Sequence, residues 1–210
     1  MMNLEILKTV EKKYLLSLIC AAAVLRLDDN LEELILLAKR KRIPNKKLYE
    51  ALLQNYLFAG YPSAIISLKI LNKLVRFTAK DSIDDMNLYH FRKRGEKNCK
   101  AIYGNKYDKL IANVNSFSPE LAGWLVLEGY GKVLGRKGLS LKERELCIVS
   151  ILTALKFEDQ LYSHINGAIR VGASVKEIEE VIKNLSLLGK KSLTGFGKKV
   201  LEKYIKSKGA

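Results

Sequence analysis

The chain matches itself when it is shifted by 130 residues, and the matched positions keep the spacing of helices. The matched pairs are Leu16 with Leu146, Leu25 with Leu155, Asp29 with Asp159, Leu31 with Leu161, Ile35 with Ile165, Ala38 with Ala168, Arg40 with Arg170, Lys46 with Lys176, and Glu50 with Glu180. Because polar positions match as well as apolar ones, the pattern favours a duplicated unit over shared amphipathicity alone. We predict one domain over residues 1–210, with repeat one at about 14–75, a joining region at about 81–139 and repeat two at about 140–205.

Each repeat reads as three helices. The first helix is apolar and ends near Arg26 or Lys156, and an Asp-rich break leads into the second. The third helix follows a turn at Pro44–Asn45 in repeat one and at Gly172–Ala173 in repeat two. Val and Thr are few and alternating patterns are rare, so the predicted fold is all-α.

Three helix starts are recognisable from their capping residues. Ser140 with Glu143, and Ser174 with Glu177, have the Ser-x-x-Glu spacing of a capping box. In the joining region, Ser118-Pro119 combines a capping Ser with Pro at the first helical position.

Composition excludes several classes of function. The chain has 37 Lys and Arg against 22 Asp and Glu, a formal charge of +15, but the basic residues are spread over every predicted helix and Lys far outnumbers Arg. Nucleic-acid modules concentrate charge on one face and use Arg for base readout, so we expect no nucleic-acid partner. A general positive field that attracts a small anionic metabolite fits better, and a Lys-rich surface that keeps the protein in solution fits better still.

The apolar segment Leu15–Leu25 resembles the core of a signal peptide. However, Glu5 and Glu11 place acidic charge where a signal has only basic charge, and the segment is too short to span a bilayer. We therefore expect a cytoplasmic protein without a membrane partner.

The three cysteines, Cys20, Cys99 and Cys147, are scattered and lack C-x-x-C spacing. This pattern predicts neither a disulfide framework nor a metal site, and it fits a reducing compartment. We expect no metal and no cofactor. His90 has no second His or Cys at ligand spacing and is interpreted as a surface or loop residue.

Two ionisable residues interrupt apolar helix faces in repeat two. Glu145 and His164 are 19 residues apart on consecutive helices, which places them at similar heights across a hairpin. Repeat one has Leu15 and Leu34 at the equivalent positions. A buried Glu beside an imidazole is a usual device for proton transfer near neutral pH. The alternative is a structural histidine that holds one helix to another.

The same region resembles the carboxymuconolactone decarboxylase family, which includes the alkylhydroperoxidase D enzymes. The resemblance rests on R-x-G-L-S-x-x-x-R-E-L from Arg136 and x-L-x-x-H-I-x-G-A-x-x-x-G-A-x-x-x-E-I-x-E around His164. Further similar positions, in the order usual for the family, are Glu50, Gln54, Tyr56, Ala59-Gly60-Tyr61-Pro62, Arg94-Gly95, Gly104, Tyr107, Trp124, Tyr130-Gly131 and Gly138-Leu139. The resemblance implies an alkylhydroperoxidase D-like helical bundle, homo-oligomers such as trimers or hexamers, and a Glu145–His164 pair facing the active cavity.

The leading functional hypothesis is a cofactor-independent decarboxylase or related lyase acting on a small carboxylated lactone. In it, His164 supplies or relays the proton and Glu145 orients His164, while Arg144 and Arg136 bind the carboxylate. Each arginine has an alternative interpretation as a solvated or helix-end charge. Trp124 and Tyr130 either line the pocket or belong to the core.

Two alternatives differ in class. A peroxiredoxin-type alkylhydroperoxidase needs a thiol pair ahead of His164, where this chain has Phe157 and Gln160. A non-catalytic oligomeric binding protein would have kept the fold and lost the chemistry. Gln160 stands where the decarboxylases often carry Glu, and repeat two ends in Gly189-Lys190-Lys191-Ser192 without the family's G-x-P, so the substrate is open to differ from carboxymuconolactone.

Overall fold

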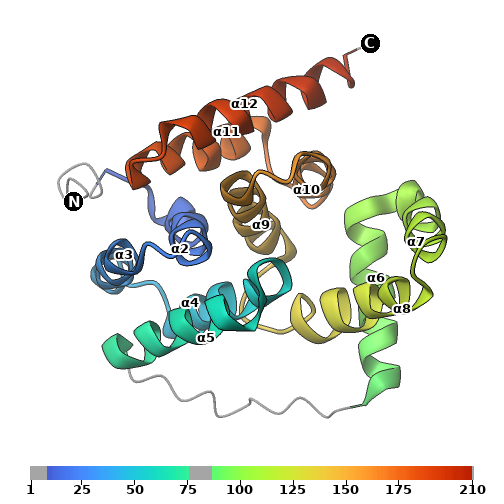
Figure 1. The fold of residues 1–210 in the computed structure, drawn as a ribbon, viewed down its shortest axis with the longest axis horizontal. Helices are drawn as coiled ribbons and strands as arrows, with labels where there is room; N and C mark the ends of the chain where they lie inside the picture. The colour runs from blue at the N-terminus through green and yellow to red at the C-terminus, as the bar shows by residue number, and fades with distance from the viewer. Residues whose placement is uncertain (1–8, 76–86, 210) are drawn as a thin grey trace.

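The computed structural model describes residues 9–75 and 87–209, and every regular element in these ranges is a helix (Figure 1). The all-α prediction is therefore confirmed. The α-helices are α2 (Leu15–Val24), α3 (Asp28–Arg40), α4 (Asn45–Gln54), α5 (Tyr56–Val75), α6 (Leu88–Tyr103), α7 (Tyr107–Asn115), α8 (Pro119–Trp124), α9 (Leu141–Leu155), α10 (Glu158–Arg170), α11 (Val175–Asn184) and α12 (Lys191–Lys206). A π-helix, η3 (Leu125–Val133), continues α8, and short 3₁₀ turns lie at η1 (Lys12–Tyr14), η2 (Gly104–Lys106) and η4 (Leu185–Leu188).

The helix bounds of the two halves correspond closely. Shifting α3 and α4 by 130 residues gives the bounds of α10 and α11. The first helix of each half is followed by a residue with left-handed backbone, Arg26 with φ 57° and Lys156 with φ 59°. Similar helix bounds do not establish a common origin, so the duplication stays a prediction. Residues 81–86 of the predicted joining region lie outside the described residues.

The capping residues begin their helices as predicted. Ser140 and Ser174 each accept a hydrogen bond from the backbone N–H three residues later, and the glutamates at those positions bond back to the cap backbone. Both cap glutamates also bind a lysine from a neighbouring helix: Glu143 pairs with Lys47 of α4, and Glu177 pairs with Lys142 of α9 at 2.8 Å. Ser118 caps α8 with Pro119 in its first turn.

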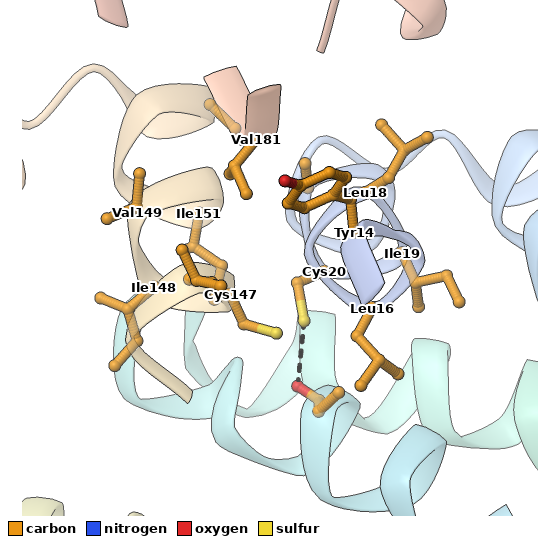
Figure 2. Close-up of a cluster of buried hydrophobic side chains, with 14 of the residues drawn as sticks. Tyr14, Leu16, Leu18, Ile19, Cys20, Cys147, Ile148, Val149, Ile151 and Val181 are labelled. Atoms are coloured by element: carbon orange, nitrogen blue, oxygen red, sulfur yellow. Dashed lines mark hydrogen bonds between the residues drawn. The ribbon is translucent and has the colours of Figure 1, made fainter. Parts of the chain in front are cut away.

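Helix α9 lies at the centre of the bundle, with α2 on one side and α10 on the other (Figure 1). The apolar segment that imitates a signal peptide forms α2, whose residues are all buried. Figure 2 shows Cys20 of α2 and Cys147 of α9 directed into the same gap between the two helices. Both thiols are free and buried, and Cys20 Sγ donates to the Ala51 carbonyl at 3.3 Å. Glu145, on the same helix, is also buried.

Two glycines let α6 and the π-helix η3 come into close contact. A Cβ on Gly95 would lie 2.0 Å from the Val126 carbonyl oxygen, and one on Gly131 would lie 2.1 Å from that of Phe91. Backbone carbonyls next to this crossing accept bonds from α6 side chains: Arg94 Nε donates to Gly131 at 2.7 Å and Asn98 Nδ2 to Tyr130 at 3.1 Å. The crossing therefore fixes the place of the Tyr130 side chain.

None of the helices within residues 9–75 and 87–209 has both the length and the hydrophobicity that crossing a membrane requires.

Candidate functional site

Glu145 of α9 and His164 of α10 meet across the hairpin that their spacing predicts. His164 Nδ1 lies 2.8 Å from Glu145 Oε2. Glu145 is fully buried, whereas His164 keeps 7% of its surface exposed. The imidazole is thus held by a buried carboxylate on one side and remains within reach of solvent.

A glycine one turn after the histidine makes room for this contact. A Cβ on Gly167 would lie 2.8 Å from Glu145 Oε2 and 2.6 Å from Ile102 Cγ2. Any larger residue would displace the Glu145 carboxylate and the Ile102 side chain. The H-I-N-G order therefore has a steric reason at this site.

Aromatic side chains surround the imidazole. The rings of Phe58 and Tyr103 both meet His164 edge-on, each with centroids 6.3 Å apart. Tyr130 stands behind Tyr103, and its hydroxyl donates to the Tyr103 hydroxyl at 2.9 Å. Burial is the main factor that raises the pKa of both phenols, so both remain protonated at neutral pH.

Two polar atoms of the Glu145–His164 pair have no partner in the described part of the chain. Glu145 Oε1 is buried without a hydrogen bond. His164 Nε2, on the far side of the ring from Glu145, makes no bond to a described residue. Because buried polar atoms are nearly always paired, Glu145 Oε1 is a place where a ligand or water can bind, and His164 Nε2 is free to bind one as well.

The two predicted carboxylate-binding arginines both bind Glu50 of α4. Arg144 Nη2 lies 3.0 Å from Glu50 Oε2 and Arg136 Nε lies 3.1 Å from Glu50 Oε1. Arg144 is buried and also donates to Gln54 and to the Arg136 carbonyl. Burial lowers the pKa of the Arg144 guanidinium, and the Glu50 carboxylate opposes that effect. Arg144 therefore has an internal carboxylate partner.

Arg136 differs from Arg144 in exposure. Its side chain is 16% exposed, and it binds Glu50 through Nε alone. Its two terminal nitrogens therefore remain available to a second carboxylate.

The two predicted aromatic site residues lie in different surroundings. Tyr130 is buried and takes part in the aromatic group beside His164 through Tyr103. Trp124 ends α8 at the surface, with 60% of its area exposed. The structure thus brings Tyr130 towards the Glu145–His164 pair and leaves Trp124 at the periphery of this chain.

The site also contains residues that the sequence interpretation did not single out. Phe58 and Tyr103 contact His164, and Glu50 and Gln54 bind Arg144. Glu50 and Gln54 belong to the similar positions quoted above, which was the available signal for them. No motif identified Phe58 or Tyr103, because their contacts depend on how α5 and α6 pack against α10.

Cys99 of α6 lies in the same part of the molecule. Burial, with the charge of Glu145 as a smaller contribution, raises the pKa of its thiol to about 12. Within residues 9–75 and 87–209, no group of three or more His, Cys, Asp or Glu side chains is placed to hold a metal ion.

Fold and site together define an all-α protein with a buried glutamate–histidine pair beside an aromatic wall. Residues 119–191, about a third of the chain, match the carboxymuconolactone decarboxylase family. The matched segment contains all six predicted site residues: Trp124, Tyr130, Arg136, Arg144, Glu145 and His164.

Three relatives resemble the chain at the level of distant homologues. A protein named 4-carboxymuconolactone decarboxylase from Acinetobacter baylyi is 29% identical over 41% of this chain and 65% of its own length. Proteins named Peroxisomal protein 2 are 28% identical in Saccharomyces cerevisiae, over 47% of this chain and 35% of that protein, and in Schizosaccharomyces pombe, over 63% of each. The chain thus spans about a third to two thirds of these relatives.

Proposed function

We propose that this protein is a cofactor-independent lyase that removes CO₂ from a small carboxylated lactone, with Glu145 and His164 as its catalytic pair. The observation that carries the proposal is the buried 2.8 Å contact between Glu145 and His164, which leaves His164 Nε2 unpartnered. The match of residues 119–191 to the carboxymuconolactone decarboxylase family supports the same reaction type, as does the similarity to a relative named 4-carboxymuconolactone decarboxylase.

The pair supplies the proton that decarboxylation requires. Glu145 accepts a hydrogen bond from His164 Nδ1, which orients the ring. When the C–CO₂ bond breaks, its electron pair stays on the substrate carbon and CO₂ leaves. An Nε2 proton of His164 then transfers to a carbon of the resulting anion, and His164 regains a proton from solvent. The product therefore carries one hydrogen in place of one carboxylate.

The substrate carboxylate needs a cationic partner before it departs. Arg136 is suited to that role because its terminal nitrogens are available, while Arg144 holds Glu50 in place beside it. The net positive charge favours the approach of a small anionic metabolite. Trp124 and Tyr130 remain proposed substrate contacts.

Turnover of 4-carboxymuconolactone in D₂O tests the proposal directly. We expect CO₂ release by the purified protein, and one solvent-derived deuterium on carbon in the product. Heat-denatured protein provides the background rate. Absence of turnover with this lactone and with related carboxylated lactones would contradict the lyase assignment.

The peroxiredoxin-type alternative is less suited to this structure. Cys20, Cys99 and Cys147 are all buried as free thiols. Burial raises the pKa of Cys20 and of Cys99, and only the thiolate attacks peroxides and disulfides.

We accordingly predict that the native thiols are unreactive. At about pH 8, Ellman's reagent should modify the native protein slowly, whereas all three cysteines should react at once in guanidinium chloride, because unfolding exposes them and restores the ordinary thiol pKa. Fast stoichiometric labelling of native Cys99, mapped by mass spectrometry, would contradict this prediction and revive a thiol mechanism.

Assembly and location complete the proposal. Several large apolar side chains are exposed on the single chain, including Tyr61 and Ile65 of α5, which supports a homo-oligomer such as a trimer or hexamer. The free cysteines support a reducing compartment such as the cytoplasm. Nucleic acid and membrane are not among the proposed partners.

A further inference from the structure

The hydroxyls of Tyr103 and Tyr130 form a directed pair beside the Glu145–His164 pair. Tyr130 donates its proton to the Tyr103 oxygen at 2.9 Å. The proton of Tyr103 itself has no acceptor among the residues that the structure describes. A phenol that accepts one hydrogen bond becomes a better donor, so Tyr103 has a strengthened and unused O–H group.

The scaffold holds both tyrosines in place. Tyr130 belongs to the π-helix η3, whose backbone is bound by Arg94 and Asn98 of α6, and Tyr103 is the last residue of α6. The two rings meet at 83° with centroids 5.9 Å apart. Since one helix crossing carries both phenols, their hydroxyls are preorganised and need no rearrangement when a ligand binds.

Tyr103 also touches the proton-transfer group. Its ring meets His164 at 70°, with centroids 6.3 Å apart. An unused donor, the unpartnered Nε2 of His164 and the unpartnered Oε1 of Glu145 therefore belong to one neighbourhood. The raised pKa of both phenols means that each remains a neutral donor at the pH where His164 transfers protons.

We propose that Tyr103, polarised by Tyr130, is the hydrogen-bond donor to an oxyanion that forms on the substrate, and that the site binds small planar oxyanions such as enolates. The inference rests on the proposed lyase function. Loss of CO₂ leaves an electron pair on carbon, and conjugation with the lactone carbonyl moves that charge onto oxygen. Tyr103 donates to this enolate oxygen until His164 delivers its proton to carbon. Tyr103 is thereby a catalytic residue of the same site.

Substituted phenolates test the proposal without the natural substrate, because they are stable planar oxyanions. The experiment measures binding of 4-nitrophenolate, and of phenols of graded acidity, through the absorbance change of the bound ion. The variants are Tyr103→Phe, Tyr130→Phe and, as the control, Tyr162→Phe. The Tyr162 hydroxyl bonds Ser207 instead of the aromatic group beside His164. Circular dichroism confirms that each variant is folded.

We expect saturable binding by the unaltered protein and a loss of about tenfold to a hundredfold in Tyr103→Phe, as for a hydrogen bond to a charged oxygen. Tyr130→Phe should lose less, because it removes only the polarising bond, and Tyr162→Phe should bind like the unaltered protein. No saturable binding, or equal binding by Tyr103→Phe, would overturn the proposal. Binding that depends on Tyr103 without any lactone turnover would instead keep the oxyanion site and remove the lyase function.

Discussion

Replacing His164 with leucine should reduce turnover of the carboxylated lactone by about 10²–10⁴-fold, the usual contribution of a positioned general acid. Leu34 of α3, which the predicted duplication pairs with His164, is fully buried, so we expect leucine to be accommodated at position 164. The expected loss is in activity per folded molecule. Initial rates combined with the folded fraction from circular dichroism measure it.

His164→Leu should also destabilise the protein, because Glu145 loses its hydrogen-bond partner. Without His164, the buried Glu145 carboxylate has no hydrogen bond to a described residue on either oxygen, and an unsatisfied buried polar group costs about 1–3 kcal/mol. The double variant Glu145→Leu with His164→Leu should recover most of this loss, as expected for directly coupled residues. Urea titrations of the unaltered protein, the two single variants and the double variant give the free energies of unfolding for this double-mutant cycle.

His90 gives the matched control, because it is the other histidine of the chain and lies exposed on α6. His90→Leu should keep both turnover and stability. A well-folded His164→Leu protein with full activity would refute the catalytic role. A parallel loss of stability, assembly and activity would instead identify His164 as a structural link between α9 and α10.

The elements of the fold that depend on local sequence were predictable. The caps at Ser140 and Ser174 and the ends of the apolar helices near Arg26 and Lys156 all follow from residues within one or two turns. The contact of Glu145 with His164 was predictable too, because a hairpin of consecutive helices restricts which residues can meet.

The partners of the arginines were not predictable in the same way. Arg144 binds Glu50 across 94 positions of sequence, and this contact depends on how α4 packs against the start of α9. Sequence patterns identified Arg136 and Arg144 as candidate site residues, but they did not show that both guanidinium groups bind the carboxylate of Glu50. The positions of Phe58 and Tyr103 beside His164 depend on long-range packing for the same reason.

The two halves of the chain therefore contribute differently to one site. The second half supplies the ionisable pair, whereas the matching positions of the first half, Leu15 and Leu34, are fully buried apolar residues. The first half contributes instead through α4 and α5, which provide Glu50 and Phe58. If the proposed reaction is correct, the first half positions the residues of the second half that carry it out.

Replacing Arg144 with methionine should destabilise the protein by about 3 kcal/mol, at the lower end of the cost of breaking a buried ion pair, because Glu50 keeps Arg136 as a partner. For a chain of this size, that loss lowers Tm by about 6–12 °C. Thermal melts followed by circular dichroism measure the shift. Lys142→Met is the matched control on the same helix, since its partly exposed pair with Glu177 should contribute at most about 1 kcal/mol.

The double variant Arg144→Met with Glu50→Leu separates a structural role from substrate binding. If Arg144 serves to neutralise Glu50, removing both charges leaves no unpaired buried carboxylate, and stability should return close to that of the unaltered protein. Arg136, which is partly exposed, can then be solvated and remains free to bind a substrate carboxylate. An Arg144→Met protein that melts normally but shows a raised KM would contradict this assignment, because it would mean that the Arg144 guanidinium binds substrate and contributes little to the fold.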